Sequence, residues 1–333
     1  MEVPLLAWLG LSAIIIALLT VDFVGHVRSP HAPSMKEAGT WSAAYIALAV
    51  SFGFIVWGMW DLNHASQYWA GWVTEWSLSL DNLFVFVIIL AAFKVPRAYQ
   101  QKVLLIGIVL SLIFRFIFIL LGVVIIERFA WVFYIFGIFL IYTAIKQAMS
   151  GVEEGHSEEE ASEEYQDNAL TRFTRKILPT TDGFVGDRML VRRDGKTYIT
   201  PMLLVIIAVG TADVMFAVDS IPAIFGLTKE PFLVFAANAF SLLGLRQLYF
   251  LIDGMLERLA FLHYGLAAIL GFIGVKLILH ALHENNLPFI NGGEGFHVWE
   301  PSIGFSLGFI VVVLTITIIT SLVYSKNKAK SEQ

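Results

Sequence analysis

Two short stretches of sequence decide how this chain folds, "EWSLSLDN" at residues 75–82 and "DVMFAVDS" at residues 213–220. Each holds two acidic residues six positions apart, inside a run that is otherwise mostly apolar. The four acidic residues are Glu75, Asp81, Asp213 and Asp219. A charge at the centre of a membrane helix costs roughly 2.5–3.5 kcal/mol on insertion scales. Two such pairs with the same spacing therefore indicate a functional site inside the membrane.

The composition around these stretches is that of a membrane protein. Of the 333 residues, 57% are hydrophobic and 15% are charged, and the mean hydropathy is +0.74, whereas soluble domains carry about 25% charged residues. The net charge of -5 gives no indication of nucleic-acid binding. The absence of cysteine excludes disulfides, thiolate metal sites and cysteine nucleophiles. We expect an all-α, polytopic bundle of membrane helices.

Apolar runs long enough to span a bilayer predict about nine transmembrane helices. They lie at about residues 4–24, 41–60, 69–93, 102–125, 129–149, 200–226, 231–252, 260–281 and 302–324. The connections that follow the odd-numbered runs carry most of the Lys and Arg residues, whereas the even-numbered connections hold only Arg128 and Lys229. The positive-inside rule therefore predicts an N-terminus outside and a C-terminus in the cytoplasm.

The acidic pairs belong to an internal repeat. After each pair the chain repeats, in the same order, a proline, an arginine and a Glu-Arg motif, the last in "ERFAWVFY" from residue 127 and "ERLAFLHY" from residue 257. The two units enter the membrane from opposite sides, which is typical of transporters with a site near the midplane. The predicted regions are two leading helices (1–66), repeat 1 (67–149), a cytoplasmic loop (150–199), repeat 2 (200–281), an outer loop (282–301) and a last helix with a basic tail (302–333).

The polar residues of the repeats form an oxygen-rich set. Positions i and i+6 of a helix are rotated by about 120° and lie about 9 Å apart, so the acids of one pair face different directions. Pro222 is expected to break its helix and free main-chain carbonyls beside Asp219. The candidate metal ligands are Glu75, Asp81, Asn82, Asp213, Asp219, Ser220 and Asn238. Such a set suits Mg²⁺, Ca²⁺ or Mn²⁺.

Two arginines are candidate counter-ions or gating residues for these acids, Arg115 and Arg246; the alternative is that both lie at helix ends and reach the lipid headgroups. When no metal is bound, some of the carboxylates should hold protons, so metal affinity is expected to rise with pH.

The two long loops carry weaker indications. The stretch "EEGHSEEEASEEYQD" from residue 153 favours a solvated linker over a metal-buffering or docking segment. In and beside the outer loop, a Gly-rich surface segment is favoured over a set of weak ligands formed by His280, His283, Glu284, Glu294, His297 and Glu300. The metalloprotease, serine hydrolase and P-loop motifs are absent, so we expect neither an enzyme nor an ATP-driven pump, and no prosthetic group.

With "EWSLSLDNLFVF", "ADVMFAVDSIPAIFG", "EPFLVFAANAFSLLGLRQLYF" and "FIGVKLIL", the chain resembles the TerC family, including its Alx branch, within the LysE-like transporter superfamily. The resemblance covers most of the chain from about residue 41 to residue 280. It implies an inner-membrane protein that exports Mn²⁺, or handles it for proteins outside the cytoplasm, with a historical link to tellurite resistance. The family's acidic positions match Glu75, Asp81, Asp213 and Asp219, and its asparagines match Asn82 and Asn238. The chain departs from the family pattern at Gly210, Ala236 and Ala237, where relatives often carry Glu, Thr and Ser.

Three functions are compatible with these observations. The first is a secondary transporter that exports Mn²⁺ or another divalent cation, with proton antiport as an open variant. The second is a membrane scaffold for secretion or stress-response proteins, which would dock on the acidic segment. The third is a channel for protons or another small ion. Protein partners and oligomeric state stay open at this point.

Overall fold

The computed structural model describes residues 1–331 except 28–33, 130, 151–178, 182, 194, 253–260, 286, 288 and 289. The acidic stretch at 153–167 and the Glu-Arg motif at 257–258 lie outside the described residues. The main chain at Asp81 and Asp219 is helical, but their side chains lie outside the described part of the structure.

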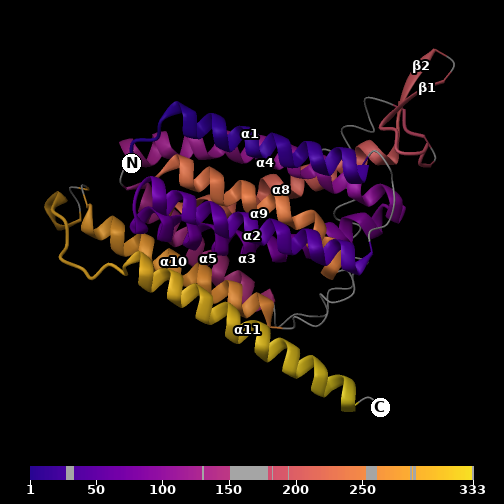
Figure 1. Ribbon diagram of the computed structural model, residues 1–333. Coiled ribbons are helices and arrows are strands. Elements are labelled where there is room, and N and C mark those ends of the chain that lie inside the picture. Colours follow the sequence, from indigo (N-terminus) through magenta and orange to yellow (C-terminus); the bar gives the residue numbers. More distant parts are fainter. Residues whose placement is uncertain are drawn as a thin grey trace.

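The described chain is a bundle of long helices (Figure 1). In chain order these helices are α1 (Leu5–Asp22), α2 (Met35–Met59), α3 (Leu62–Ala92), α4 (Arg97–Arg128), α5 (Val132–Ser150), α8 (Pro201–Phe225), α9 (Pro231–Ile252), α10 (Leu262–His283) and α11 (Ile303–Ser331). The shorter elements are a π-helix (Phe23–Val27) after α1, strands β1 (Leu190–Arg193) and β2 (Lys196–Ile199), and a 3₁₀ turn (Asn291–Gly293). Among the described helices, eight are long and apolar enough to cross a membrane, and α3 is the ninth long helix. The prediction of a polytopic α-helical membrane protein is confirmed.

Helix starts follow the capping chemistry of the sequence. Ser34 and Glu37 form a reciprocal capping box, which begins α2 six residues before the apolar run predicted at 41–60. Asp61 accepts a hydrogen bond from the main-chain N–H of His64 at 2.8 Å and begins α3. Pro201 occupies the first turn of α8, where its missing N–H costs nothing.

One prediction about α8 is wrong. Pro222 does not break the helix, which continues to Phe225 with the proline inside it. Because Pro222 lies in the last turn, the helix loses a hydrogen bond close to an end whose carbonyls are already short of donors. The structure therefore gives no unwound segment beside Asp219.

Two pairs of neighbouring helices in the centre of the bundle, α3 with α9 and α4 with α8, are parallel. α9 is almost completely enclosed and packs against α2, α3 and α4. Gly71 and Ser79 of α3 lie against Ala237 and Ser241 of α9, so these two helices are parallel. α4 and α8 are parallel as well, because residues 107 and 122 of α4 lie against residues 209 and 225 of α8.

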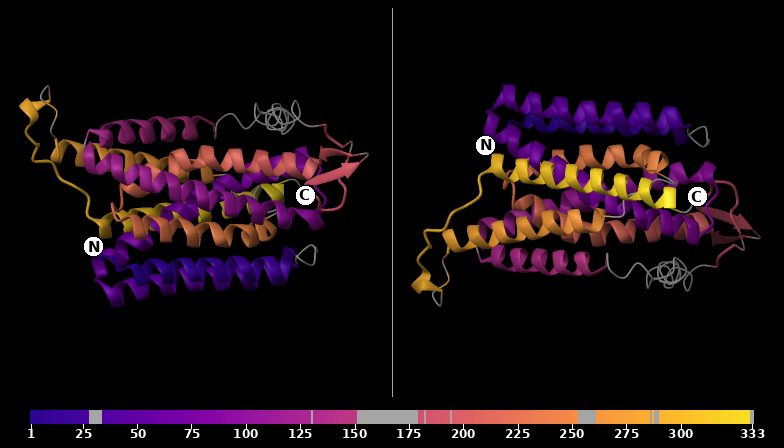
Figure 2. Two further views of the ribbon diagram at one scale, coloured as in Figure 1. Left: turned by 90° about the horizontal axis from the view of Figure 1, so that it is seen from above. Right: turned by 90° about the horizontal axis from the view of Figure 1, so that it is seen from below.

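Helices α5 and α10 form an antiparallel pair at the edge of the bundle (Figure 2). Gly137 and Gly274 meet where they cross, and a Cβ added to Gly137 would lie 2.8 Å from the carbonyl oxygen of Gly274. Toward one end of the pair Phe133 packs on His280, and toward the other Gln147 contacts His263. Small residues thus allow the two backbones to approach closely, as in many membrane helix pairs.

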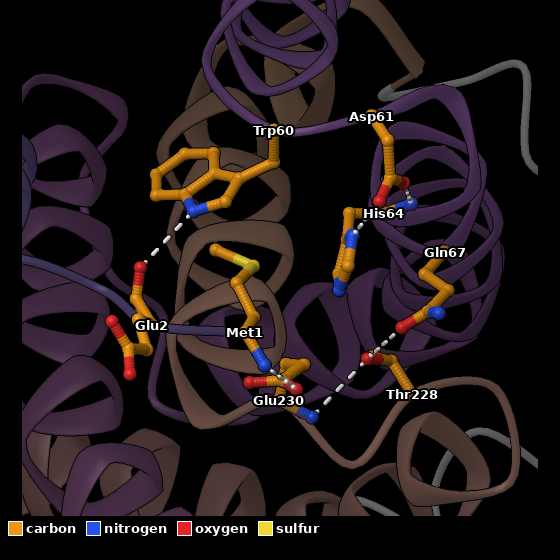
Figure 3. A network of polar contacts seen from close by, with 8 residues as sticks. All are labelled: Met1, Glu2, Trp60, Asp61, His64, Gln67, Thr228 and Glu230. Carbon is orange, nitrogen blue, oxygen red and sulfur yellow. Dashed lines mark hydrogen bonds and ion pairs between the residues drawn. The ribbon is translucent and has the colours of Figure 1, made fainter.

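The bundle has two different ends (Figure 1, Figure 2). The N-terminus and the segment 290–302 lie at one end, together with a polar network in which Thr228 Oγ1 donates to Gln67 Oε1 at 2.6 Å and the Met1 amine donates to Glu230 Oε1 at 2.8 Å (Figure 3). Strands β1 and β2 and the end of α11 lie at the opposite end.

The hairpin β1–β2 is an element that the sequence analysis did not predict. Its two strands pair antiparallel and turn at Gly195, whose φ of +75° is a left-handed conformation that suits glycine. Lys102 of α4 fixes the preceding loop, because its Nζ donates to Asp187 Oδ2 at 2.7 Å and to the main-chain oxygen of Asp187 at 2.9 Å. The described residues between 183 and 199 of the predicted loop therefore form a folded segment that is attached to α4 through Lys102.

Candidate ion-binding site

The centre of the candidate site is a buried ion pair between α3 and α4. Arg115 is completely buried, and its Nη1 donates to Glu75 Oε2 at 2.5 Å. Glu75 is also completely buried. A charge this far from water persists only when it is paired and hydrogen-bonded, so Arg115 and Glu75 depend on each other.

Helices α8 and α9 complete the site. Arg115 Nη1 also donates to Asn238 Oδ1 at 2.6 Å and to Ser220 Oγ at 3.1 Å, and Arg115 Nε lies 3.8 Å from Asp213 Oδ2. Asn238 donates its own Nδ2 to the carbonyl of Val234 at 3.1 Å, which turns its amide oxygen toward the guanidinium. One carboxylate of each acidic stretch, Glu75 and Asp213, thus faces the same guanidinium.

This site leaves buried polar atoms with unused hydrogen-bonding capacity. Within the described residues, Glu75 Oε1, both carboxylate oxygens of Asp213, and Arg115 Nη2 have no hydrogen-bond partner. An unpaired buried polar atom costs about 1–3 kcal/mol. Unpaired carboxylate oxygens from two helices, beside an amide and a hydroxyl oxygen, fit water or a hard cation that prefers oxygen ligands.

The structure brings together four of the seven predicted ligands. Glu75, Asp213, Ser220 and Asn238 surround Arg115. Asn82 is buried about two turns further along α3 than Glu75 and shares a cavity with Ser220. The side chains of the remaining two, Asp81 and Asp219, are outside what the structure describes. The residues that it does describe contain no group of three or more His, Cys, Asp or Glu side chains placed to hold a metal.

Of the two predicted counter-ions, Arg115 contacts the acidic stretches, whereas Arg246 belongs to a different buried ion pair. Arg246 Nη2 donates to Asp22 Oδ1 at 2.5 Å, and both side chains are almost completely buried. Asp22 is the last residue of α1, so this pair connects α1 to α9. The sequence analysis missed Asp22, although a lone acid at the end of an apolar run was a detectable signal.

The candidate weak ligands of the outer loop are separate from this site. His280 Nδ1 and Glu300 Oε1 lie 2.8 Å apart beside a cavity of about 420 Å³ that also exposes Thr228, Glu230 and Lys276. This cavity lies at the end of the bundle that holds the N-terminus, and a lysine in its wall disfavours a cation.

The family of the chain follows from comparison with known proteins. The sequence profile of the integral membrane protein TerC family matches residues 60–329. The chain belongs to the TerC family. The matched residues include the whole candidate site, whereas α1 with Asp22 precedes them.

Curated relatives of this TerC protein match nearly the whole chain. An uncharacterized membrane protein of Mycobacterium tuberculosis is 46% identical over 98% of this chain and 81% of its own length. An uncharacterized membrane protein of Myxococcus xanthus is 36% identical over 98% and 94%. A protein of Escherichia coli named "Putative membrane-bound redox modulator Alx" is 36% identical over 83% and 86%. No solved structure matches the chain.

Proposed function

We propose that this TerC protein is a secondary transporter that exports a divalent cation, Mn²⁺ first, through the site around Arg115. The observation that carries the proposal is the meeting of Glu75 and Asp213, the first acids of the two stretches, at one buried guanidinium. Both carboxylates retain oxygens without a hydrogen-bond partner among the described residues. Oxygen ligands of this kind select Mg²⁺, Ca²⁺ or Mn²⁺ over zinc or copper.

The helix packing supports two units of opposite direction. If α3 corresponds to α8 and α4 to α9, the contact of Gly71 with Ala237 has a counterpart within one residue in the contact of Gly107 with Val209. The third helices of the units, α5 and α10, run antiparallel, as an axis in the membrane plane requires. Such inverted units provide alternating access by moving one unit against the other.

Arg115 gives the transport cycle a resident cation. In the metal-free protein its guanidinium neutralises part of the charge of Glu75 and Asp213. A divalent cation that binds the same oxygens must push the guanidinium aside, because two cations in one desolvated site repel each other. When the cation binds, the two carboxylates therefore exchange the guanidinium for the metal ion. We propose that this exchange is coupled to the movement of one unit against the other.

The two ends of the bundle support export from the cytoplasm. Many of the described basic residues, including Lys94, Arg97 and Lys102, lie toward the end of the bundle that holds β1, β2 and the C-terminal end of α11. Basic connections favour the cytoplasmic side. We propose that this end is cytoplasmic, in the inner membrane, and that the N-terminus and the segment 290–302 are outside.

The name of the Escherichia coli relative suggests a redox role, but such a role could not depend on thiols in this chain. The chain contains no cysteine, so thiol exchange is not available to it. Transport of a redox-active metal ion would give the protein an influence on redox balance without thiols. No enzymatic step is part of this proposed function.

Transport by the purified protein tests the proposal. Proteoliposomes containing a Mn²⁺-quenched dye report uptake for a panel of divalent cations, with and without a pH gradient. Glu75→Gln, Asp81→Asn and Asp219→Asn should each abolish Mn²⁺ transport, because each removes a hard anionic ligand without changing size. Asp187→Asn is the matched control, since this partly exposed acid pairs with Lys102, which lies 13 residues before Arg115 on α4. Wild-type transport by the three site variants would overturn the proposal.

A further inference from the structure

A second polar cavity lies directly beside the site. It has a volume of about 110 Å³ and is bordered by α3, α5, α8 and α10. Its polar lining consists of Asn82, Thr143, Gln147 and Ser220, and the rest of the wall is formed by leucines and Phe216. Four polar side chains around one small space inside a membrane bundle cost free energy unless they meet polar partners, so the cavity is suited to a polar occupant.

Ser220 belongs both to the cavity wall and to the proposed site. The hydroxyl of Ser220 accepts a hydrogen bond from Arg115, and the same residue lines the cavity. Asn82 and Ser220 occupy corresponding positions of the two acidic stretches, each directly after the second acid. Ser220 is therefore a direct polar neighbour of both the cavity and Arg115.

The contribution of α5 is not a product of the repeat. The repeated Glu-Arg motif at residues 127 and 257 relates α5 to α10 by an offset of 130 residues, so Thr143 and Gln147 correspond to Ile273 and Leu277. Both of those residues are apolar and buried. The hydroxyl and amide of α5 therefore form a polar approach that the corresponding positions of α10 do not reproduce.

The far side of this approach lies near the end of α5. Gln147 Nε2 and His263 Nδ1 lie 3.0 Å apart, where α5 ends and α10 begins. This end of α5 points toward the end of the bundle that holds β1 and β2, which we assign to the cytoplasm. The contact between Gln147 and His263 thus stands between the cavity and that end.

We propose that this cavity is the entry chamber in which a partly hydrated divalent cation is held by Thr143 and Gln147 before it reaches the carboxylates. The inference rests on the proposed transport function and adds two cargo-contacting residues to it. A water molecule in the liquid occupies about 30 Å³, so the chamber has room for a cation with several waters. Neutral oxygens bind the water shell of such an ion weakly, which allows it to move on.

Thr143→Val and Gln147→Leu test the chamber in the proteoliposome assay. Each variant should raise the Mn²⁺ concentration at half-maximal transport about threefold to tenfold, because each removes one neutral oxygen contact, and should leave the maximal rate nearly unchanged. Thr315→Val is the matched control, since Thr315 lies on the exposed face of α11. If both chamber variants transport like wild type while Glu75→Gln is inactive, the chamber is wrong and the transport site stands. If Glu75→Gln also transports like wild type, the proposed function fails first.

Thiol chemistry gives a second test that needs no transport. The chain lacks cysteine, so Thr143→Cys introduces a single thiol into the chamber. A small cationic methanethiosulfonate should modify this thiol from the side of β1 and β2, and Mn²⁺ should slow the reaction. Thr315→Cys should show no Mn²⁺ protection. A reaction at Thr143→Cys that Mn²⁺ does not slow would overturn the proposal, and this measurement decides the case if Gln147→Leu fails to accumulate.

Discussion

Replacement of Arg115 by methionine is the most informative single change in this protein. The guanidinium is completely buried and contacts carboxylates from two helices. Arg115→Met leaves Glu75 and Asp213 buried without their cation. Removing one partner of a buried ion pair costs about 3–5 kcal/mol, so the metal-free variant should be less stable than wild type by about this amount.

The same variant should bind Mn²⁺ more tightly. In wild type the ion must first break hydrogen bonds from Nη1 to Glu75, Asn238 and Ser220. A hydrogen bond that involves a charged group contributes about 1.5–3 kcal/mol. If displacement costs the equivalent of only one such bond, the dissociation constant for Mn²⁺ should fall about 10- to 100-fold in Arg115→Met. At a concentration 100-fold above that constant, Mn²⁺ should restore about 2.7 kcal/mol of stability.

Thermal unfolding of the purified protein in detergent measures both effects, with and without Mn²⁺, and the electron paramagnetic resonance of free Mn²⁺ measures binding directly. Arg246→Met is the matched control, because this arginine is equally buried and has a carboxylate partner at the same 2.5 Å. It should destabilise the protein by a similar amount, but Mn²⁺ should not restore its stability beyond the effect seen in wild type. Equal restoration in Arg115→Met, Arg246→Met and wild type would refute the idea that the guanidinium occupies the cation site.

Three further predictions concern the rest of the fold. Single cysteines at Lys196 and Glu294 should be labelled by an impermeant thiol reagent from opposite sides of the membrane, Glu294 from outside; labelling of both from one side contradicts the topology. A hydrogen bond from Lys102 lowers the pKa of Asp187 from its ordinary value of 3.8. The pair therefore stabilises the folded loop above about pH 3.8, and this stabilisation is lost as the pH falls through the lowered pKa. Because the pair is partly exposed, Asp187→Asn should cost less than about 1 kcal/mol at pH 7, and faster amide exchange in residues 183–199 would report it. Gly137→Ala should destabilise the protein by about 1–3 kcal/mol, since a Cβ there would meet a main-chain oxygen 2.8 Å away on α10; an unchanged thermal midpoint would show that the helices separate freely.

The fold class and part of the site could be read from the sequence because lipid imposes strong rules. Apolar runs of spanning length have to be helices, since the bilayer offers no partner for free main-chain groups. The same environment makes any charge conspicuous, so Glu75, Asp213 and Arg115 were recognisable as a set before their contacts were known. Their meeting followed from the repeat, which predicts that corresponding helices lie together.

What the sequence could not give depends on rotation and packing of individual helices. Thr143 and Gln147 are ordinary polar residues in an apolar run until α5 is placed beside α3 and α8. Asp22 became a partner of Arg246 only because α1 lies against α9. The predicted break at Pro222 was wrong, because a proline in the last turn of a helix removes only one main-chain hydrogen bond close to the helix end. The turn at Gly195 was detectable, because Asp-Gly between two short strand-like segments, LVRR and KTYI, is a known hairpin signal.

The charges of the site restrict how cation and proton movements can be linked. With both carboxylates ionised, Glu75, Asp213 and Arg115 together carry one net negative charge. Adding a divalent cation while the guanidinium stays would give one net positive charge in a site that is buried away from bulk solvent, which is unfavourable. If the guanidinium leaves, the two carboxylates and the cation are neutral, and Arg115 needs a new anionic partner. If both acids are already ionised in the metal-free site, loading does not require proton release from them. Coupling to protons would instead fall on the second acids of the stretches, Asp81 and Asp219, which gives the two members of each acidic pair separate tasks.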